Sequence, residues 1–331
     1  MGKSYADPPS ATTAGKSQDF PVFYHLTTMN IQTKEIEDRL QVMGKYFDLD
    51  ALLGKDTDNQ AVEKYYRKSD FFYKLVHGQG GRAIHMGLSE DECFHKDDFL
   101  AQARFVGSLL DRPSMEILEV GAGRLFNTKY LAKTFPGCHF TALDLPDRNF
   151  LKNRVPSNVQ LREGDYNDLS VFPENSFDLV FGVETICHAE DKEHVFKEIH
   201  RVLKPGGRLV IFDVYESKSQ QEMTELERRA SAVTLAAMCI TTKDHYIGDI
   251  CRYLETSFSE VQVADVTQKI RPTLRRLDRI CCFYFMHPRF IRFTQKHFPA
   301  DANMNSIAGW LMLFTFDGEN LHKYTRLVAV K

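Results

Sequence analysis

The stretch that decides the fold is Ile117-Leu118-Glu119-Val120-Gly121-Ala122-Gly123, a short apolar run that ends in a Gly-x-Gly turn. Glycine at positions 121 and 123 lets the backbone turn tightly and approach a ligand closely. The helix predicted after this turn would present its N-terminus to the same ligand. Asp144 follows Gly121 by 23 residues, at the end of the next apolar run. A carboxylate there can accept hydrogen bonds from both hydroxyls of a ribose.

Further short apolar runs follow along the chain and predict the rest of a sheet. They cover residues 138–144, 159–164, 177–183, 208–214, 259–267 and 325–330. Helical patterns separate several of them, notably 191–203, which ends at Lys204-Pro205-Gly206-Gly207. Short apolar strands that alternate with helices are typical of a doubly wound α/β fold, in which helices cover both faces of a parallel sheet.

Three regions are expected along the chain. Residues 1–18 are rich in Ser, Thr, Ala, Pro and Lys, and are expected to form a disordered tail. Residues 19–110 are expected to be mostly helical, with helices over 31–47 and 99–110. Residues 111–331 hold the α/β domain. Its helical insertions are expected at about 215–258 and 268–322.

Composition excludes several classes of protein. The chain has 331 residues, is 43% hydrophobic and carries a net charge of −3, which argues against wholesale disorder and against nucleic acid as the main partner. No apolar run approaches the roughly 20 residues that cross a bilayer, and the N-terminus lacks a signal-peptide core, so a cytoplasmic location is expected. Seven cysteines without a CxxC pair indicate reduced thiols and no metal centre.

Two cofactor classes fit a Gly-x-Gly turn followed by an acid. A dinucleotide site needs a third glycine where this chain has Phe126, and Glu119 would lie unfavourably beside phosphates. S-adenosylmethionine (SAM) has no phosphate and carries a cationic amino group, which an acid at the end of a strand suits. The sequence therefore favours SAM.

The motifs downstream of the turn support this choice. Glu163-Gly164-Asp165-Tyr166 follows the third strand, Gly182-Val183-Glu184 follows the fourth, and 201–207 precedes the fifth. Over residues 115–215 this ordered set resembles the class I SAM-dependent methyltransferases. The resemblance implies a Rossmann-like, seven-stranded, mostly parallel sheet with an N-terminal helical lid. It also implies SAM as cofactor, S-adenosylhomocysteine as product and no metal.

The same resemblance implies a set of cofactor-binding residues. Glu119, Gly121 and Gly123 would line the methionine end, Asp144 the ribose, and Asp165 with Tyr166 the adenine. The full set is Glu119, Gly121, Gly123, Asp144, Leu145, Asp165, Tyr166 and Glu184. Many members have a third glycine where this chain has Leu125, so a less tight turn into the helix is expected.

A narrower resemblance starts from Glu184-Thr185-Ile186-Cys187-His188-Ala189, which is similar to a segment of sterol C-methyltransferases and of related bacterial enzymes that act on isoprenoids. Residues 62–88 resemble the N-terminal segment of the same group, which lids the cofactor. Tyr65-Tyr66, Phe71-Phe72-Tyr73 and the Gly-rich turn before His85 match in order, whereas His77-Gly78 replaces the usual Trp-Gly. The resemblance implies catalytic roles for Glu184, His188 and Tyr66.

Three functions remain open on these residues. The first is methyl transfer to carbon of a small, lipophilic, sterol-like or isoprenoid acceptor, as part of lipid, isoprenoid or secondary metabolism. The second is N- or O-methylation of a small alkaloid or aromatic metabolite. The third is a non-catalytic SAM-binding protein. The partners expected are a small-molecule acceptor, at most a peripheral membrane contact, and a second copy of the chain as a possible homo-oligomer.

Some features also have a purely structural interpretation. Glu184 can be a carboxylate at a helix start, and His188 a packing histidine that bonds to the backbone. The basic stretch 269–279 fits a solvated helix face, contact with a membrane surface, or a site for the diphosphate of an isoprenoid. The aromatic residues of 283–293 fit either plain core or the wall of an apolar pocket.

Overall fold

The computed structural model describes residues 23–331 except 56, 77–82, 147–149, 299 and 318–320. It describes no side chains at 23–32, 70–82, 147–150, 299–302 and 317–320. The tail expected at 1–18 and the motif residues His77-Gly78 lie outside the described residues, as do the side chains of Phe71-Phe72-Tyr73.

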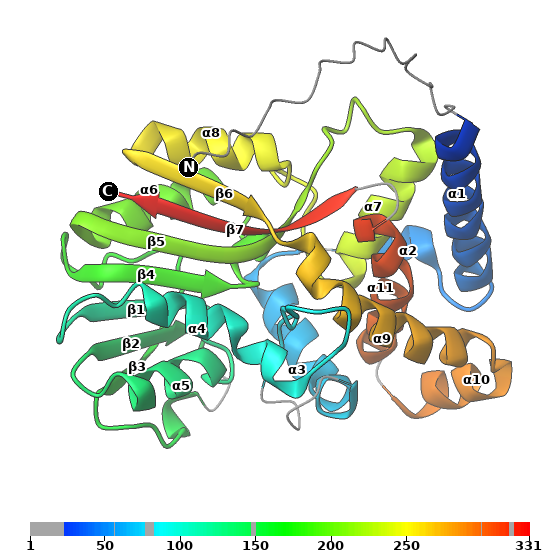
Figure 1. The fold of residues 1–331 in the computed structure, drawn as a ribbon. Coiled ribbons are helices and arrows are strands. Elements are labelled where there is room, and N and C mark those ends of the chain that lie inside the picture. Colours follow the sequence, from blue (N-terminus) through cyan, green and yellow to red (C-terminus); the bar gives the residue numbers. More distant parts are fainter. Residues whose placement is uncertain (1–22, 56, 77–82, 147–149, 299, 318–320) are drawn as a thin grey trace, which may run out of the picture.

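Seven strands form one sheet in the order β3-β2-β1-β4-β5-β7-β6 (Figure 1). Their bounds are Glu116–Val120 (β1), His139–Asp144 (β2), Val159–Glu163 (β3), Phe177–Val183 (β4), Leu203–Glu216 (β5), Glu260–Asp265 (β6) and His322–Val330 (β7). Strands β1 to β5 pair in parallel, and β7 runs antiparallel between β5 and β6. The prediction of a seven-stranded, mostly parallel sheet is confirmed.

Helices are distributed between the sheet and a second cluster beyond one end of it. Their bounds are Phe23–Gly44 (α1), Leu49–Leu53 (α2), Asn59–Val76 (α3), Ala101–Ser108 (α4), Phe126–Thr134 (α5), Lys192–Val202 (α6), Glu225–Ala237 (α7), Ile247–Ser257 (α8), Thr267–Phe285 (α9), Pro288–His297 (α10) and Ala300–Asp317 (α11). None of the described helices is long and apolar enough to cross a bilayer.

Alternate residues of the strands face two separate cores. Ile117 of β1 packs in one core with α4 and α5, whereas its neighbour Leu118 packs in the other with α6 and α8. Phe181 and Val180 of β4 divide in the same way. Both faces of the sheet are therefore covered, which explains why its strands read as nearly continuous apolar runs.

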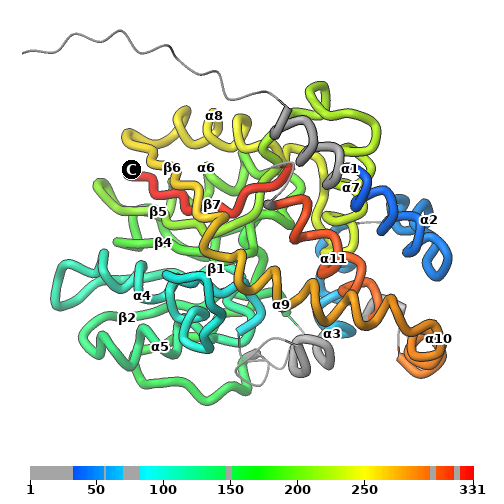
Figure 2. The backbone as a smooth tube through the Cα atoms, turned by 45° about the vertical axis from the view of Figure 1, so that its right-hand side comes forward, coloured from blue at the N-terminus to red at the C-terminus, as the bar shows by residue number. Residues whose placement is uncertain are grey.

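The remaining helices form a second cluster beyond the carboxyl ends of the parallel strands. Helix α11 packs against α9, α7, α3 and α1 (Figures 1 and 2). The insertions expected at 215–258 and 268–322 are indeed mostly helical, since they hold α7 with α8 and α9 to α11. In open α/β sheets ligands bind outside the carboxyl ends of the strands, so this cluster lies where an acceptor site belongs.

Several element bounds differ from the sequence prediction, and the last strand begins at His322 rather than at 325. The first helix begins at Phe23 rather than at 31. Strand β5 begins at Leu203 rather than at 208, because Leu203 pairs with Phe177 and the ladder resumes at Arg208 after a shift of register. The Lys204–Gly207 stretch, expected to precede this strand, thus lies within it.

Candidate active site

A narrow cleft lies at the carboxyl ends of β1, β2 and β4, around the Gly-x-Gly turn. Gly121 and Gly123 both have positive φ, at 63° and 53°. A Cβ atom on Gly121 would lie 1.9 Å from Oγ1 of Thr185, so only glycine fits there. A Cβ atom on Gly123 would lie 3.1 Å from Cδ1 of Ile84. A residue of the N-terminal part of the chain therefore packs directly against the turn.

The expectation of a less tight turn at Leu125 is wrong. Leu125 has φ 61° and ψ 29°, the left-handed conformation that a glycine would supply. Its side chain is fully buried, in a small core with Ala122 and Ala142. Burial of the leucine offsets the roughly 1–2 kcal/mol that a left-handed conformation costs an L-residue.

Asp144 ends β2 and is held by the backbone of the turn that it faces. Its Oδ2 atom accepts a hydrogen bond from the Gly123 amide, and its Oδ1 atom accepts one from the Leu145 amide at 2.8 Å. The carboxylate is buried and lines the cleft together with Leu145. A buried carboxylate at this position suits a pair of vicinal hydroxyls.

Glu119 lines the same cleft at the end of β1. Its carboxylate accepts hydrogen bonds from the hydroxyl and the amide of Thr128 and from the amide group of Asn127, all in the first turn of α5. Burial raises the pKa of Glu119 to about 7. A cation bound in the cleft would compensate that cost of burial.

The predicted adenine residues lie at different places. Tyr166 is buried and lines the cleft, and its hydroxyl donates to the carbonyl of Thr185 at 2.9 Å. Asp165 is not part of the described lining. Its carboxylate accepts hydrogen bonds from the side chains of Asn59 and Asn167. Asn59, the first residue of α3, lines the cleft instead.

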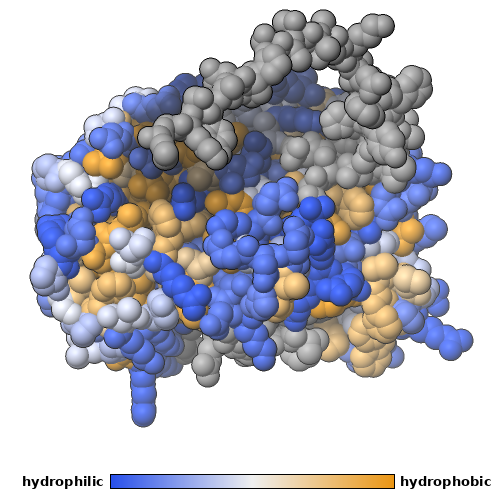
Figure 3. Space-filling view, viewed as in Figure 1, coloured by the Kyte–Doolittle hydropathy of each residue, from blue (hydrophilic) through white to orange (hydrophobic). Residues whose placement is uncertain are grey.

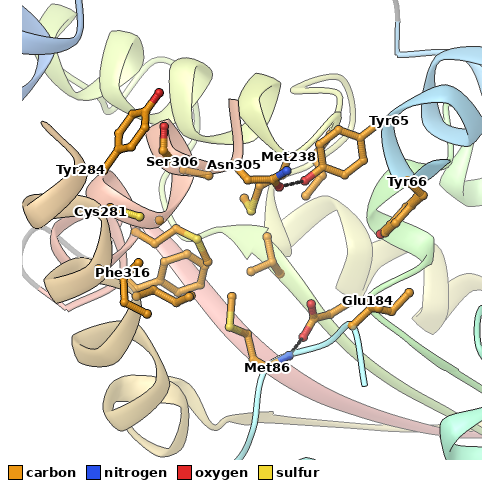
Figure 4. A pocket seen from close by; sticks show the side chains of 18 of the residues that line it. Tyr65, Tyr66, Met86, Glu184, Met238, Cys281, Tyr284, Asn305, Ser306 and Phe316 are labelled. Carbon is orange, nitrogen blue, oxygen red and sulfur yellow. Dashed lines mark hydrogen bonds between the residues drawn. The ribbon is translucent and has the colours of Figure 1, made fainter. Parts of the chain in front are cut away.

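A second cavity of about 360 Å³ lies among the helices of the second cluster. Its walls come mainly from α9, α10 and α11, and they are largely apolar and aromatic (Figure 4). Phe283, Tyr284, Phe290 and Phe293 line it, whereas Phe285 is core and stacks on a tryptophan of α11. Its described lining contains no lysine or arginine. Such a cavity fits a lipophilic molecule and lacks a cation for a diphosphate.

The two spaces meet at Tyr66, Ile84, Glu184 and His188, which line both. All three predicted catalytic residues are therefore at this junction. In Figure 4 Tyr66 and Glu184 lie at one end of the cavity, and Tyr284 and Ser306 lie at the other.

Glu184 combines backbone strain with partial burial of its carboxylate. Its side chain is partly buried, its φ is 49°, and its Oε1 atom accepts hydrogen bonds from the Met86 amide at 2.6 Å and the Tyr324 hydroxyl at 2.8 Å. Burial raises its pKa to about 8, and the nearby charge of Asp213 adds to the shift. Backbone strain and a partly buried carboxylate with a raised pKa, at the junction of two cavities, indicate a functional group rather than a structural one.

His188 and Tyr66 form a hydrogen-bonded pair. The Nδ1 atom of His188 lies 2.9 Å from the carbonyl of Cys239, and Nε2 lies 2.9 Å from the Tyr66 hydroxyl. A carbonyl only accepts, so Nδ1 carries a proton and donates it to Cys239. The hydrogen bond at Nε2 fixes the orientation of the Tyr66 ring, which is packed edge-on against the imidazole.

Several site residues were not predicted from the sequence. Asp213 of β5 is buried and accepts hydrogen bonds from the amides of Thr185 and Cys187, so it holds the loop that carries Glu184 and His188. The only feature of the sequence that marks Asp213 is its position as the single acidic residue of the apolar run 208–214. Asn59 and Ile84 reach the cleft from far away in the chain, and no local pattern marks them.

The basic stretch 269–279 has partners in residues 90–94, which are distant in the chain and close in space. Lys269 and Arg275 pair with Glu90 and Glu92 at 2.8 Å, and Arg276 lies over the ring of Phe94. No basic residue of the stretch lines the described cavity wall. The geometry thus gives no support to a diphosphate site in the cavity formed by this stretch.

Comparison with known proteins finds similarity to methyltransferases. Residues 118–211 match the methyltransferase domain family. The chain is 31% identical over 169 residues to glycine/sarcosine/dimethylglycine N-methyltransferase of Actinopolyspora halophila, with 48% of this chain and 29% of the relative covered. It is 35% identical over 161 residues to a sterol 24-C-methyltransferase of Gibberella zeae, with 46% of this chain and 40% of the relative covered.

Solved structures share the fold over a longer range. The cyclopropane synthase MmaA2 from Mycobacterium tuberculosis superimposes with a TM-score of 0.64 at 15% identity, over 82% of this chain and 98% of that one. The chain thus contains a class I SAM-dependent methyltransferase domain, similar to that of the sterol C-methyltransferases, and this recognition from the sequence is confirmed. The chain spans less than two thirds of the length of the curated relatives that it matches.

Proton release is the expected signature of cofactor binding. The pKa values of Glu119 and Glu184, about 7 and about 8, lie above those of ordinary glutamates, so both groups are partly protonated near pH 7. A bound cation favours their ionised forms and lowers both pKa values. SAM affinity should therefore rise with pH between about 6 and 8, and binding at pH 7 should release protons.

Calorimetry in two buffers of different ionisation enthalpy measures this release. The Glu119→Gln variant should release fewer protons than the wild-type chain. An affinity that is flat across the same pH range, with no dependence on the buffer, would contradict the assignment of these carboxylates to the cation.

Proposed function

We propose that this chain transfers a methyl group from SAM to a carbon atom of a small, lipophilic, sterol-like acceptor. The observation that carries the proposal is the junction itself. The cleft at Gly121 and Asp144 opens at Glu184, Tyr66 and His188 into a large apolar cavity. Donor and acceptor bound in the two spaces would have their reacting groups side by side, which is the main requirement of an in-line displacement.

The cleft fits SAM on the chemistry of its residues. Glu119 and Asp144 are buried carboxylates that line the cleft, and they would hold the amino group and the ribose. When bound, SAM supplies an electrophilic methyl group on a positively charged sulfur and becomes S-adenosylhomocysteine.

Glu184 would act at the acceptor end. If an alkene provides the electron pair for the new carbon–carbon bond, a carbocation remains on the acceptor. The Glu184 carboxylate and the face of the Tyr66 ring would stabilise this charge, and Glu184 would accept the proton whose loss restores a double bond. The apolar wall of the cavity excludes water, which would otherwise capture the cation.

N-methylation of a small amine is the second candidate, and the N-methyltransferase relative favours it. Glu184 and Tyr66 would then bind the ammonium form of the acceptor and take its proton. The cavity argues for the first candidate, because its volume exceeds the need of an amino acid and its described wall offers no cation to a substrate carboxylate.

Radiolabelled SAM tests the proposal directly. The chain is incubated with four acceptors separately: a sterol with a side-chain double bond, geranyl diphosphate, sarcosine and a simple phenol. We expect label in the sterol. Label only in sarcosine or the phenol would move the function to the second candidate. Label only in geranyl diphosphate would contradict the proposal, because the described cavity wall offers no lysine or arginine to a diphosphate.

A further inference from the structure

The exposed apolar side chains gather at the mouth of the large cavity. Nine large apolar side chains are exposed among the described residues, and five of them lie between residues 280 and 293, including all three exposed aromatic ones. They are Ile280, Phe283, Met286, Phe290 and Phe293. Figure 3 shows apolar side chains gathered at the lower right, where α10 lies in Figure 1. We call these five side chains the apolar rim.

The rim is continuous with the cavity. Ile280, Phe283, Phe290 and Phe293 also line the cavity wall, whereas Met286 stands outside it and is 71% exposed. The rim joins the two helices, because Tyr284 of α9 packs edge-on against Phe290 of α10. A lipophilic molecule that enters past these side chains would stay in contact with apolar surface throughout.

Positive charge flanks the rim on one side. Between residues 279 and 298 the sequence contains Arg279, Arg289, Arg292 and Lys296 and no aspartate or glutamate. All four basic residues are exposed, and Arg289, Arg292 and Lys296 form no ion pair within the described part of the chain. This differs from the stretch 269–279, whose Lys269 and Arg275 are paired.

The order of residues on α10 arranges the two kinds of side chain in rows. At about 100° per residue, Arg289, Arg292 and Lys296 share one side of the helix, and Phe290 with Phe293 lies on the next. The buried residues Ile291 and Thr294 lie on the far side of the aromatic row. A row of phenylalanines beside a row of basic residues is the pattern of a helix that lies in a membrane interface.

We infer that the apolar rim and its basic row dock this protein onto the surface of an anionic lipid bilayer, with the cavity mouth facing the lipid. Charge complementarity selects a bilayer with anionic headgroups, and the apolar side chains enter the boundary of the acyl chains. The purpose of this docking, delivery of an acceptor from lipid to the cavity, rests on the proposed function. The docking itself needs neither SAM nor acceptor.

Vesicle co-sedimentation tests the inference. The full chain is mixed with vesicles of phosphatidylcholine alone or with about 30% phosphatidylserine. We expect at least tenfold stronger binding to the anionic vesicles, weakened by salt. Arg289→Glu combined with Arg292→Glu should lower that binding at least tenfold, and so should Met286→Asp, which lies outside the cavity.

Matched variants and a second measurement complete the test. Lys133→Glu with Arg162→Glu, and Val171→Asp, make the same chemical changes at exposed sites away from the rim and should bind vesicles as the wild-type chain does. Unchanged SAM affinity would show that all variants are folded. Equal binding by rim and control variants, or no preference for anionic vesicles, would overturn the inference. So would a dimer in light scattering that Met286→Asp dissociates, because a second copy would then cover the rim.

The vesicle result is independent of catalysis. Vesicle binding without methyl transfer to any acceptor would contradict the proposed function and leave the docking surface standing. Methyl transfer without vesicle binding would do the reverse.

Discussion

Glu184→Gln is expected to lower the rate of methyl transfer to a side-chain alkene of a sterol, measured at saturating SAM, by roughly 10²–10⁴-fold. Glutamine has the shape of glutamate, and its carbonyl oxygen can still accept the hydrogen bonds from Met86 and Tyr324. The amide cannot take a proton and carries no charge to stabilise a cation. The change therefore removes the chemistry and keeps the packing.

Glu216→Gln is the matched control. Glu216, like Glu184, is a glutamate whose pKa is raised by burial. It lies outside both cavities, and its carboxylate accepts hydrogen bonds from Ser231 and Gln220. Its replacement should leave turnover within about threefold of the wild-type value. Unchanged turnover in Glu184→Gln would contradict the assignment of Glu184 as the base.

Gly121→Ala is expected to weaken SAM binding by about 100-fold, or about 2.7 kcal/mol. The new Cβ atom would lie 1.9 Å from Oγ1 of Thr185, and Thr185 cannot retreat easily because Asp213 accepts from its amide. The turn must then shift away from the cofactor position. Calorimetry with SAM measures the loss, and a thermal melt reports how much of it is global stability.

Gly206→Ala is the control that separates the two effects of a methyl group at Gly121, the steric clash with Thr185 and the strain of a positive φ. Gly206 also has positive φ, at 74°, but no atom lies within 4 Å of where its Cβ would be. This variant should lose only about 1 kcal/mol of folding free energy and keep its SAM affinity. If both variants bound SAM equally well, the Gly-x-Gly turn would not be the cofactor site.

The sequence predicts the local parts of this site well. Gly121, Gly123 and Asp144 follow strands at a fixed spacing, and parallel strands bring their carboxyl ends to one edge of the sheet. Glu184 and His188 were found through a contiguous motif, and the structure brings both to the junction with Tyr66. The α/β architecture follows from alternation of apolar strands and helices for the same local reason.

The rest depends on contacts between distant residues, which single-sequence patterns do not record. Leu125 adopts a left-handed conformation, and burial of its side chain in a core with Ala142 offsets the cost of that conformation. The partners of Lys269 and Arg275, Glu90 and Glu92, lie about 180 residues away in the chain. The cavity itself is assembled from α3, α9, α10 and α11 together with β5 and β7, so its volume and apolar character could not be predicted from any one segment.

Binding of SAM in the cleft at Asp144 is measured by calorimetry on the wild-type chain and on Asp144→Ala. Asp144→Asn serves as control for the loss of charge alone. We expect micromolar binding of SAM and of S-adenosylhomocysteine that weakens at least tenfold, about 1.4 kcal/mol, in Asp144→Ala. Absence of binding to the wild-type chain, or binding that is indifferent to Asp144, would contradict this expectation.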